Sequence, residues 1–254
     1  MFKHKKVNLI LKKILIIFVW LAIWQSAAVL TGLDFLIAGP VNVFMALIKL
    51  LKMRVLYLSV VHTFTKVTAG FVIAFLSGSL LGSMSGKYNN LRLFLQPLLY
   101  TMQTLPVASF IILLLIWFGS SSVAFLISFI VVFPMIYNGF LSAMDNLDIK
   151  LEQMSDVFGV PLLKKIRCVY LSQLMSDIQG TLKSAVSMGF KAGVSAEVIG
   201  LVKNSIGEQI YYSKLYMTTA DLFAWSIVLI FISIIFEHIF IKCINGFTNF
   251  VKRP

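Results

Sequence analysis

The sequence predicts an all-α, polytopic membrane protein whose residues 1–254 form a single transmembrane domain. Hydrophobic residues make up 59% of the chain and charged residues 13%, whereas soluble domains have about 45–50% and about 25%. The mean hydropathy is +0.92. A helix that crosses a bilayer needs about 20 apolar residues, and the chain offers about six such stretches.

We expect each of these stretches to be a span. The first is expected to be retained, because no small-residue cleavage pattern of a signal peptide follows Leu30. The second is longer than one span requires, so its first residues are expected at the interface. The fifth is diluted by Gln179, Lys183 and Lys191. The predicted spans are residues 14–30, 57–84, 98–118, 123–141, 178–202 and 222–241, with a core of about 57–241.

The distribution of Lys and Arg predicts that both termini are cytoplasmic. In this orientation 15 of the 22 basic residues lie on the cytoplasmic side and five on the opposite side, as the positive-inside rule requires. The net charge of +12 therefore reflects topology in a plasma or inner membrane, and does not indicate a nucleic-acid-binding face.

No residue pattern indicates an enzyme or a metal site. There is no Ser/His/Asp or Cys/His set, and the three histidines are scattered without ligand spacing. Residues 82–88 have three residues between their glycines where a phosphate-binding loop needs four, and Tyr88 replaces its Ser or Thr. Gly78, Gly82 and Gly86 recur every four residues, which favours close helix packing over a ligand site.

Two ionisable residues, Lys66 and Glu197, fall within apolar stretches, where such groups are functional candidates. Lys66 can also snorkel or lie at the interface. Glu197 lies among small residues such as Gly193 and Gly200, which fit a close helix contact and a cavity wall equally well.

A charged, amphipathic loop over residues 145–177 interrupts the apolar chain between the fourth and fifth spans. Its first half has apolar residues at three- and four-residue spacing, which predicts a short amphipathic helix. Gly159 permits a left-handed stop, and Pro161 suits the first turn of a second helix. The pair fits either a docking surface or helices lying flat on the anionic inner leaflet. The apolar residues are Leu147, Leu151, Met154, Val157 and Phe158, then Leu162, Leu163, Ile166 and Val169.

The run from Gly159 through Glu197 to Gly207 resembles the permease subunit of ABC importers, in the nitrate/sulfonate/taurine-type family of binding-protein-dependent transport components. The EAA loop of that family has Glu-Ala-Ala, three residues and Gly. Here the register gives Gln153, Met154, Ser155 and Gly159, a partial match in which Ser172 and Ser176 also replace two prolines. Further segments fall in the order and spacing of the family: His62-Thr63-Phe64, Gly70-Phe71, Gly78, Gly82, Pro97, Pro106, Trp117-Phe118-Gly119, Phe190 to Glu197 and Ser205-Ile206-Gly207.

The resemblance implies that the loop carries a coupling helix seated in a groove of an ABC ATP-binding subunit. The other implied partners are an extracytoplasmic solute-binding protein and a second permease copy, as a homodimer or with a permease that has the fuller motif. The chain itself would bind no cofactor and would not be an enzyme, since ATP and Mg belong to the partner ATPase. The implied coupling residues are Leu151, Glu152, Gln153, Met154, Ser155, Asp156, Val157, Phe158, Gly159, Val160 and Pro161.

The implied function is to form the translocation path for a small anionic or heterocyclic solute. The path is expected along the dimer axis, lined by the third to fifth spans, although Ser and Thr can equally bond their own helix backbone. A secondary transporter and a non-transporting membrane assembly protein are the alternatives, and neither should co-purify with an ATPase. The polar candidates for the path are Gln103, Thr104, Ser184, Ser187, Ser195 and Glu197.

Overall fold

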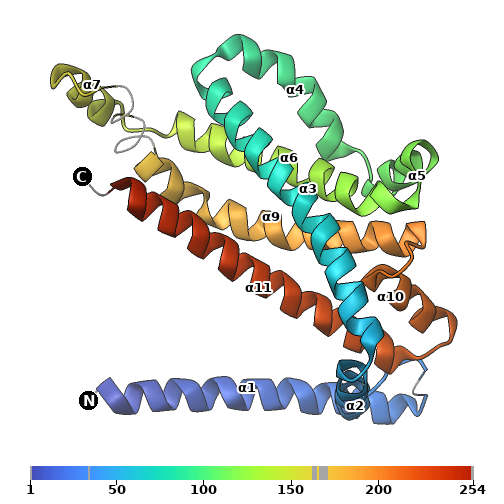
Figure 1. Ribbon diagram of the computed structural model, residues 1–254. Coiled ribbons are helices and arrows are strands. Elements are labelled where there is room, and N and C mark those ends of the chain that lie inside the picture. The colour runs from blue at the N-terminus through green and yellow to red at the C-terminus, as the bar shows by residue number, and fades with distance from the viewer. Residues whose placement is uncertain (1, 34, 162–164, 166–170, 253–254) are drawn as a thin grey trace.

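The computed structural model describes residues 2–33, 35–161, 165 and 171–252, and every regular element among them is a helix (Figure 1). This confirms the all-α class. The helices are α1 (Phe2–Thr31), α2 (Pro40–Leu51), α3 (Arg54–Lys87), α4 (Asn89–Thr104), α5 (Val107–Phe118), α6 (Ser120–Asp145), α7 (Ile149–Val157), α9 (Leu171–Gly200), α10 (Ile206–Leu215) and α11 (Thr219–Lys252).

The core lies where α3, α6, α9 and α11 meet. α3 packs along α6, and α6 packs in turn against α9. Phe71, Tyr137 and Phe190 are fully buried there. The ring of Phe71 makes edge contacts with Phe236 and Phe240 of α11, at centroid distances of 5.3 and 4.9 Å, the geometry that aromatic pairs prefer. The outer helix α11 is thereby joined to the centre of the bundle.

The α3 helix approaches α6 closely because glycines line its facing side. A Cβ atom at Gly82 would lie 2.6 Å from the backbone oxygen of Tyr137, and one at Gly86 would lie 2.5 Å from the Cβ of Met144. Gly70 and Gly78 face the same helix. Small residues at such positions allow two backbones to pack without intervening side chains. We call this row of four glycines the α3–α6 glycine row.

Four helical segments are long and apolar enough to cross a membrane within the described part of the chain: residues 11–31, 54–87, 120–145 and 219–246. The pair α4 and α5 passes the same test jointly, but is bent by 101°. The structure therefore has four candidate spans, or five if the bent pair is one span. A count of six stays a prediction.

Two predicted spans differ from the structure. The third, residues 98–118, is not one straight helix, because Leu105 and Pro106 adopt extended backbone angles between α4 and α5. Proline lacks the N–H that a continuous helix needs and disfavours helical angles in the residue before it. The fifth, residues 178–202, is helical almost throughout in α9, but α9 is not among the candidate spans.

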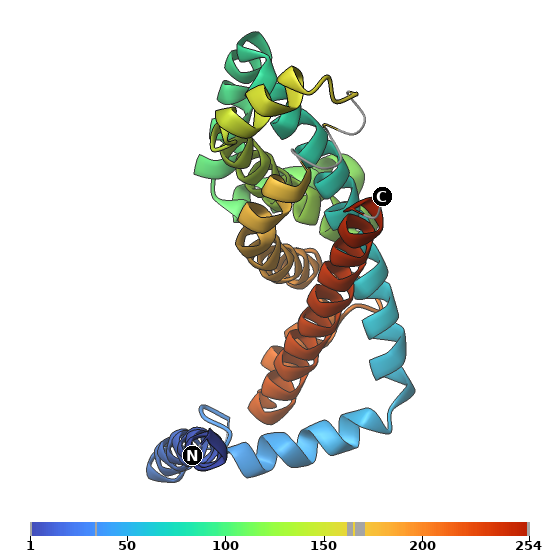
Figure 2. The same cartoon turned by 90° about the vertical axis from the view of Figure 1, so that its left-hand side faces the viewer.

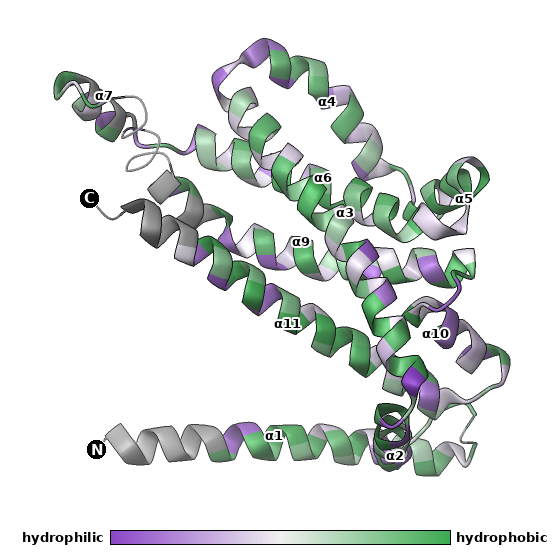
Figure 3. Cartoon of the chain, viewed as in Figure 1, coloured by the Kyte–Doolittle hydropathy of each residue, from purple (hydrophilic) through white to green (hydrophobic). Residues whose placement is uncertain are grey.

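The chain termini and α7 lie at one end of the molecule, on the left-hand side of Figure 1, while α2, α5 and α10 lie towards the other (Figures 1 and 2). α1 lies apart from the bundle and approaches it near α2 and at Trp24, whose ring lies 5.5 Å from that of Phe223. Hydrophobic residues predominate along the described part of α1 and along α11 (Figure 3), as expected of helices facing lipid.

Candidate functional site

The most exposed functional candidate is α7, which projects from the end of α6 beyond the bundle (Figure 1). Asp148 begins it by accepting the backbone N–H of Lys150 at 2.9 Å. The Asp148 backbone N–H donates to the side chain of Gln173, at the start of α9. The helix closes at Gly159, which has a φ of +61°. At its end the backbone N–H of Val160 donates to the oxygen of Ser155 at 3.0 Å, as in a glycine-terminated helix.

Four apolar side chains of α7 and its C-terminal end are exposed. The relative exposure is 85% for Val157 and 73% for Phe158, and Leu151 and Met154 are also exposed. We call these four residues the α7 apolar face. Ser155 lies on the buried side. Exposed apolar clusters of this kind are typical of surfaces that contact another protein or a membrane.

Not every residue of the predicted coupling loop can be placed. The second predicted helix, with Leu162, Leu163, Ile166 and Val169, lies outside the described residues, as do the side chains of Glu152 and Asp156. Gln153 and Pro161 are exposed, and Val160 is half-buried. The described residue of the second half is Lys165, which is helical and whose backbone N–H donates to the oxygen of Pro161 at 2.9 Å.

The predicted path residues fall into two groups. Gln103 and Thr104 are exposed at the end of α4, and Ser184 and Ser195 are exposed on α9, with Ser187 half-buried beside them. The hydroxyl of Thr104 donates to the oxygen of Tyr100, and that of Ser195 to the oxygen of Lys191. These two hydroxyls therefore satisfy their own helix backbones.

Glu197 does not share the exposed face of α9, since its side chain is fully buried. One carboxylate oxygen, Oε2, accepts the hydroxyl of Thr63 at 2.8 Å and the backbone N–H of Gly207 at 3.2 Å. The Thr63 hydroxyl in turn accepts the backbone N–H of Ile206 at 2.9 Å. The carboxylate thus ties together α3, α9 and the start of α10. We call Thr63, Glu197, Ile206 and Gly207 the three-helix junction.

The turn that brings α10 to this junction is built by a helix cap. The hydroxyl of Ser205 accepts the backbone N–H of Glu208 at 3.0 Å, and the carboxylate of Glu208 accepts the backbone N–H of Asn204 at 2.7 Å. Side-chain bonds of this kind to the first backbone N–H groups fix where a helix starts. A Cβ at Gly207 would lie 2.6 Å from the backbone nitrogen of Val198, so the approach of α10 to α9 requires glycine there.

The geometry is that of a helical membrane bundle with an ordered, projecting helix at one end. The profile of the family described as "Binding-protein-dependent transport system inner membrane component" matches residues 74–241, which is more than half of the chain. The chain belongs to this family. The match contains α7, α9 and Glu197, whereas Thr63 lies before it.

One relative can be aligned with most of this permease. The chain is 25% identical over 224 residues to the putative aliphatic sulfonates transport permease protein SsuC of Bacillus subtilis (strain 168), which covers 86% of the permease and 79% of the relative. Both comparisons agree with the resemblance drawn from the sequence motifs. The chain is therefore the non-catalytic, multi-pass membrane component of a binding-protein-dependent ABC transport system.

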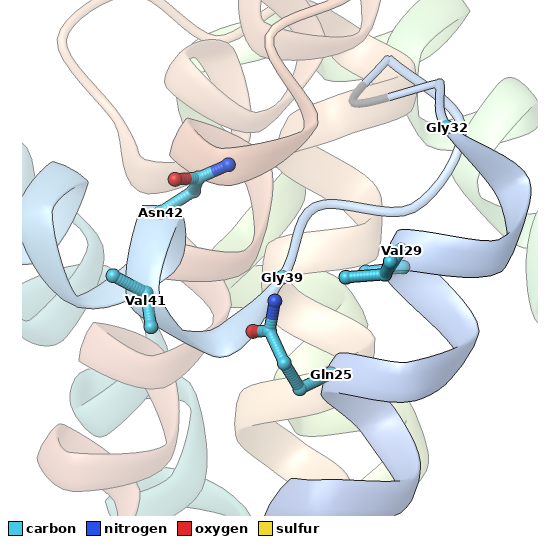
Figure 4. A pocket seen from close by; sticks show the side chains of 7 residues that line it. Gln25, Val29, Gly32, Gly39, Val41 and Asn42 are labelled. Atoms are coloured by element: carbon cyan, nitrogen blue, oxygen red, sulfur yellow. The ribbon is translucent and has the colours of Figure 1, made fainter.

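A small pocket lies at the other end of the permease from α7, between α1 and α2 (Figure 4). Its volume is about 180 Å³, and its lining includes the amide side chains of Gln25 and Asn42 and the backbone of Gly39. None of its lining residues is charged. A Cβ at Gly39 would lie 2.9 Å from Oε1 of Gln25. The pocket is thus a packing gap at the α1–α2 contact.

Sequence reasoning missed three features of the permease. Thr63 and Gly207 meet Glu197 from positions 134 and 10 residues away, and no local spacing indicates such pairs. The family motif includes Gly70, but its packing role was not predicted, and it extends the α3–α6 glycine row by two turns. Gly70, Ala74 and Gly78 follow one another at four-residue spacing, and Ala74 is also small and buried. This spacing of small residues could have indicated the longer row.

Proposed function

We propose that two copies of this permease form the translocation path of an ATP-driven importer for a small organic anion delivered by an extracytoplasmic binding protein. Aliphatic sulfonates are the leading candidate class, because the name of the Bacillus subtilis relative states them. The observation that carries the mechanism is the α7 apolar face, which is ordered, projecting and uncovered in the single chain.

The proposed occupant of this face is an ABC ATP-binding subunit, which would also hold ATP and Mg. Burying Val157 and Phe158 would remove two large apolar side chains from water, worth about 1.5–3 kcal/mol each when complete. A helix lying flat on the inner leaflet would bury the same residues, but the projection of α7 past the bundle favours a partner that grips it from the cytoplasm (Figure 1). In this proposal both termini are cytoplasmic, as the distribution of Lys and Arg also favours.

The coupling step requires that movement of the ATPase reach the path. α7 follows α6 after residues 146–148 only, and α6 packs along the α3–α6 glycine row. Packed helices transmit displacement because protein interiors are dense and deform little. Closure of two ATP-binding subunits would therefore move the α3–α6 pairs of the two permeases and change which side of the membrane the path opens to.

Co-purification tests this function with matched variants. The permease is expressed with its ATP-binding subunit, and the complex is isolated through a tag on the permease. Phe158→Asp should lower the amount of retained ATPase at least tenfold, because a carboxylate replaces an apolar contact. Tyr216→Asp is the control, since Tyr216 is equally exposed on the α10 side of the molecule. Retention of a full complement of ATPase by Phe158→Asp would exclude the proposed contact.

A transport readout separates this function from its rivals. The complex in proteoliposomes, with the binding protein outside, should hydrolyse ATP faster when that protein and ethanesulfonate are present, and should accumulate ethanesulfonate only with ATP. A secondary transporter would accumulate solute from an ion gradient without any ATPase, and an assembly protein would accumulate none.

A further inference from the structure

One face of α9 is polar and exposed although the helix is packed among membrane spans. The exposed residues follow the spacing of a single helix face. The lower part has Ser184, with Ser187 half-buried beside it, and the upper part has Lys191 and Ser195. Met188 and Ile199 are its exposed apolar members. We call this surface the α9 polar face.

The neighbouring helices expose a different kind of surface. On α11 the exposed side chains of the central turns include Ile230, Phe231, Ile234 and Ile235. On α3 they include Ile73, Leu76 and Leu80. Those faces suit lipid, whereas a lysine side chain is costly in hydrocarbon. The α9 polar face is therefore expected to be turned to water or to another polypeptide.

Lys191 lies well inside α9, more than two turns from the C-terminal end of the helix. It precedes the end of α9 at Gly200 by nine residues, which is about 14 Å at 1.5 Å per residue. In a helix whose end marks the edge of the hydrocarbon core, a residue at this distance would lie near the middle of a core about 30 Å thick. A lysine side chain extends only part of this distance.

The charge of Lys191 has no carboxylate partner among the described residues. The ion pair found there joins Arg92 to Asp145 at 3.2 Å. Glu197, six residues further along α9, is buried on the other side of the helix and bonded to Thr63 and Gly207. An unpaired cation on an exposed face within a bundle of candidate membrane spans is complementary to an anion.

We propose that the α9 polar face lines the translocation path and that the Lys191 ammonium group is its anion-binding point, with Ser195 one turn nearer to α10. This proposal deepens the proposed function and rests on it, since the path is taken to conduct an organic anion. In a two-fold dimer both copies of Lys191 would serve one path. Substrate would be held by charge at this depth and released when the path opens to the other side.

Thiol labelling tests the proposal without knowledge of the natural substrate. Ser195→Cys is introduced after Cys168→Ser and Cys243→Ser, in the complex that co-purifies with the ATPase. The probes are two methanethiosulfonates of similar size, one with an anionic ethylsulfonate group and one with a cationic ethyltrimethylammonium group. Labelling rates are measured with and without ATP and vanadate, so that both openings of the path are sampled. Ile234→Cys on α11 is the lipid-facing control.

We expect Ser195→Cys to be labelled in at least one state and Ile234→Cys in neither. Adding Lys191→Gln should lower the ratio of anionic to cationic labelling rates about tenfold, the effect of losing roughly 1.4 kcal/mol of charge attraction. Lys214→Gln removes an exposed charge on α10 and should leave the ratio unchanged.

Three results would overturn the proposal. They are an unlabelled Ser195→Cys in a complex that retains its ATPase, a ratio that Lys191→Gln does not change, and a ratio that Lys214→Gln lowers equally. If the permease with its unaltered α7 did not retain the ATPase, the proposed function would be excluded instead. That result would be seen in the co-purification, before any labelling.

Discussion

The hydroxyl of Thr63 on α3 donates to the carboxylate of Glu197 on α9 across 2.8 Å, and both side chains are buried. The same hydroxyl accepts the backbone N–H of Ile206 at 2.9 Å. One oxygen atom therefore joins three helices, because a hydroxyl can donate and accept at once. A carboxylate that is costly to bury is retained where it satisfies a donor from each of two other elements.

Replacing Thr63 by valine should destabilise the permease. Thr63→Val keeps the shape of the side chain but leaves the backbone N–H of Ile206 without its acceptor and Glu197 without one donor. The expected loss in free energy of unfolding is about 1–3 kcal/mol, measured by thermal unfolding in detergent. The control is Thr65→Val, since the exposed Thr65 hydroxyl donates to the oxygen of Val61 in its own helix. Equal stability of the two variants would show that the junction contributes nothing.

Substitutions of Glu197 should separate hydrogen bonding from charge. Glu197→Gln keeps an oxygen that can accept from Thr63 and Gly207, so we expect the protein to fold and transport. Glu197→Leu removes the oxygen that accepts from both donors and should lower the free energy of unfolding by more than about 2 kcal/mol. Uptake assays and unfolding curves check both variants. If Glu197→Gln folds normally yet abolishes uptake, then the charge itself has a role in transport.

The α3–α6 glycine row should tolerate no added methyl group. Gly82→Ala places a Cβ against the backbone oxygen of Tyr137, at 2.6 Å unless the helices separate. Overpacking of this kind costs about 1–3 kcal/mol. Gly180→Ala on α9 is the control, because nothing lies within 4 Å of its added Cβ, and alanine favours a helix over glycine by about 1 kcal/mol. A Gly82→Ala protein that unfolds no earlier than the Gly180→Ala protein would contradict the close approach.

The end of α7 should depend on a left-handed residue. Gly159 has a φ of +61° with open space around it, so a substitution is opposed by backbone conformation and not by contacts. Gly159→Val should disfavour the turn by about 1–2 kcal/mol, leave the protein inserted, and uncouple ATP hydrolysis from uptake. Gly159→Asn should keep more of the coupling, because asparagine tolerates this conformation. The ratio of solute imported to ATP hydrolysed measures the effect, and normal transport by Gly159→Val counts against the coupling role.

Long apolar runs made much of this fold predictable. The runs that became α6 and α11 are apolar along most of their length, so hydropathy alone located them. The bend at Leu105 and Pro106 was not predicted, because the summed hydropathy of residues 98–118 does not show whether the helix axis changes direction. α9 is apolar on its packed side only, and its lysines and serines reduce the average that identifies a span.

The candidate site was predictable only where it is local. The left-handed end at Gly159 follows from the residue type, and the spacing of Leu151 and Met154 fits one apolar face. The contact of Thr63 with Glu197 joins residues 134 positions apart and depends on how three helices cross. The role of Lys191 required knowing which side of α9 is exposed, and its position in the sequence does not give that.

The short connection between α6 and α7 limits how this machine can work. Only residues 146–148 separate the two helices, and Arg92 of α4 holds Asp145 at the very end of α6. A displacement of α7 by the ATPase must therefore displace α6 as well, because so short a connection cannot take up the movement. Lengthening this connection by a few flexible residues would leave the α7 apolar face and the residues of the translocation path unchanged. ATP hydrolysis would nevertheless no longer drive the opening of the path.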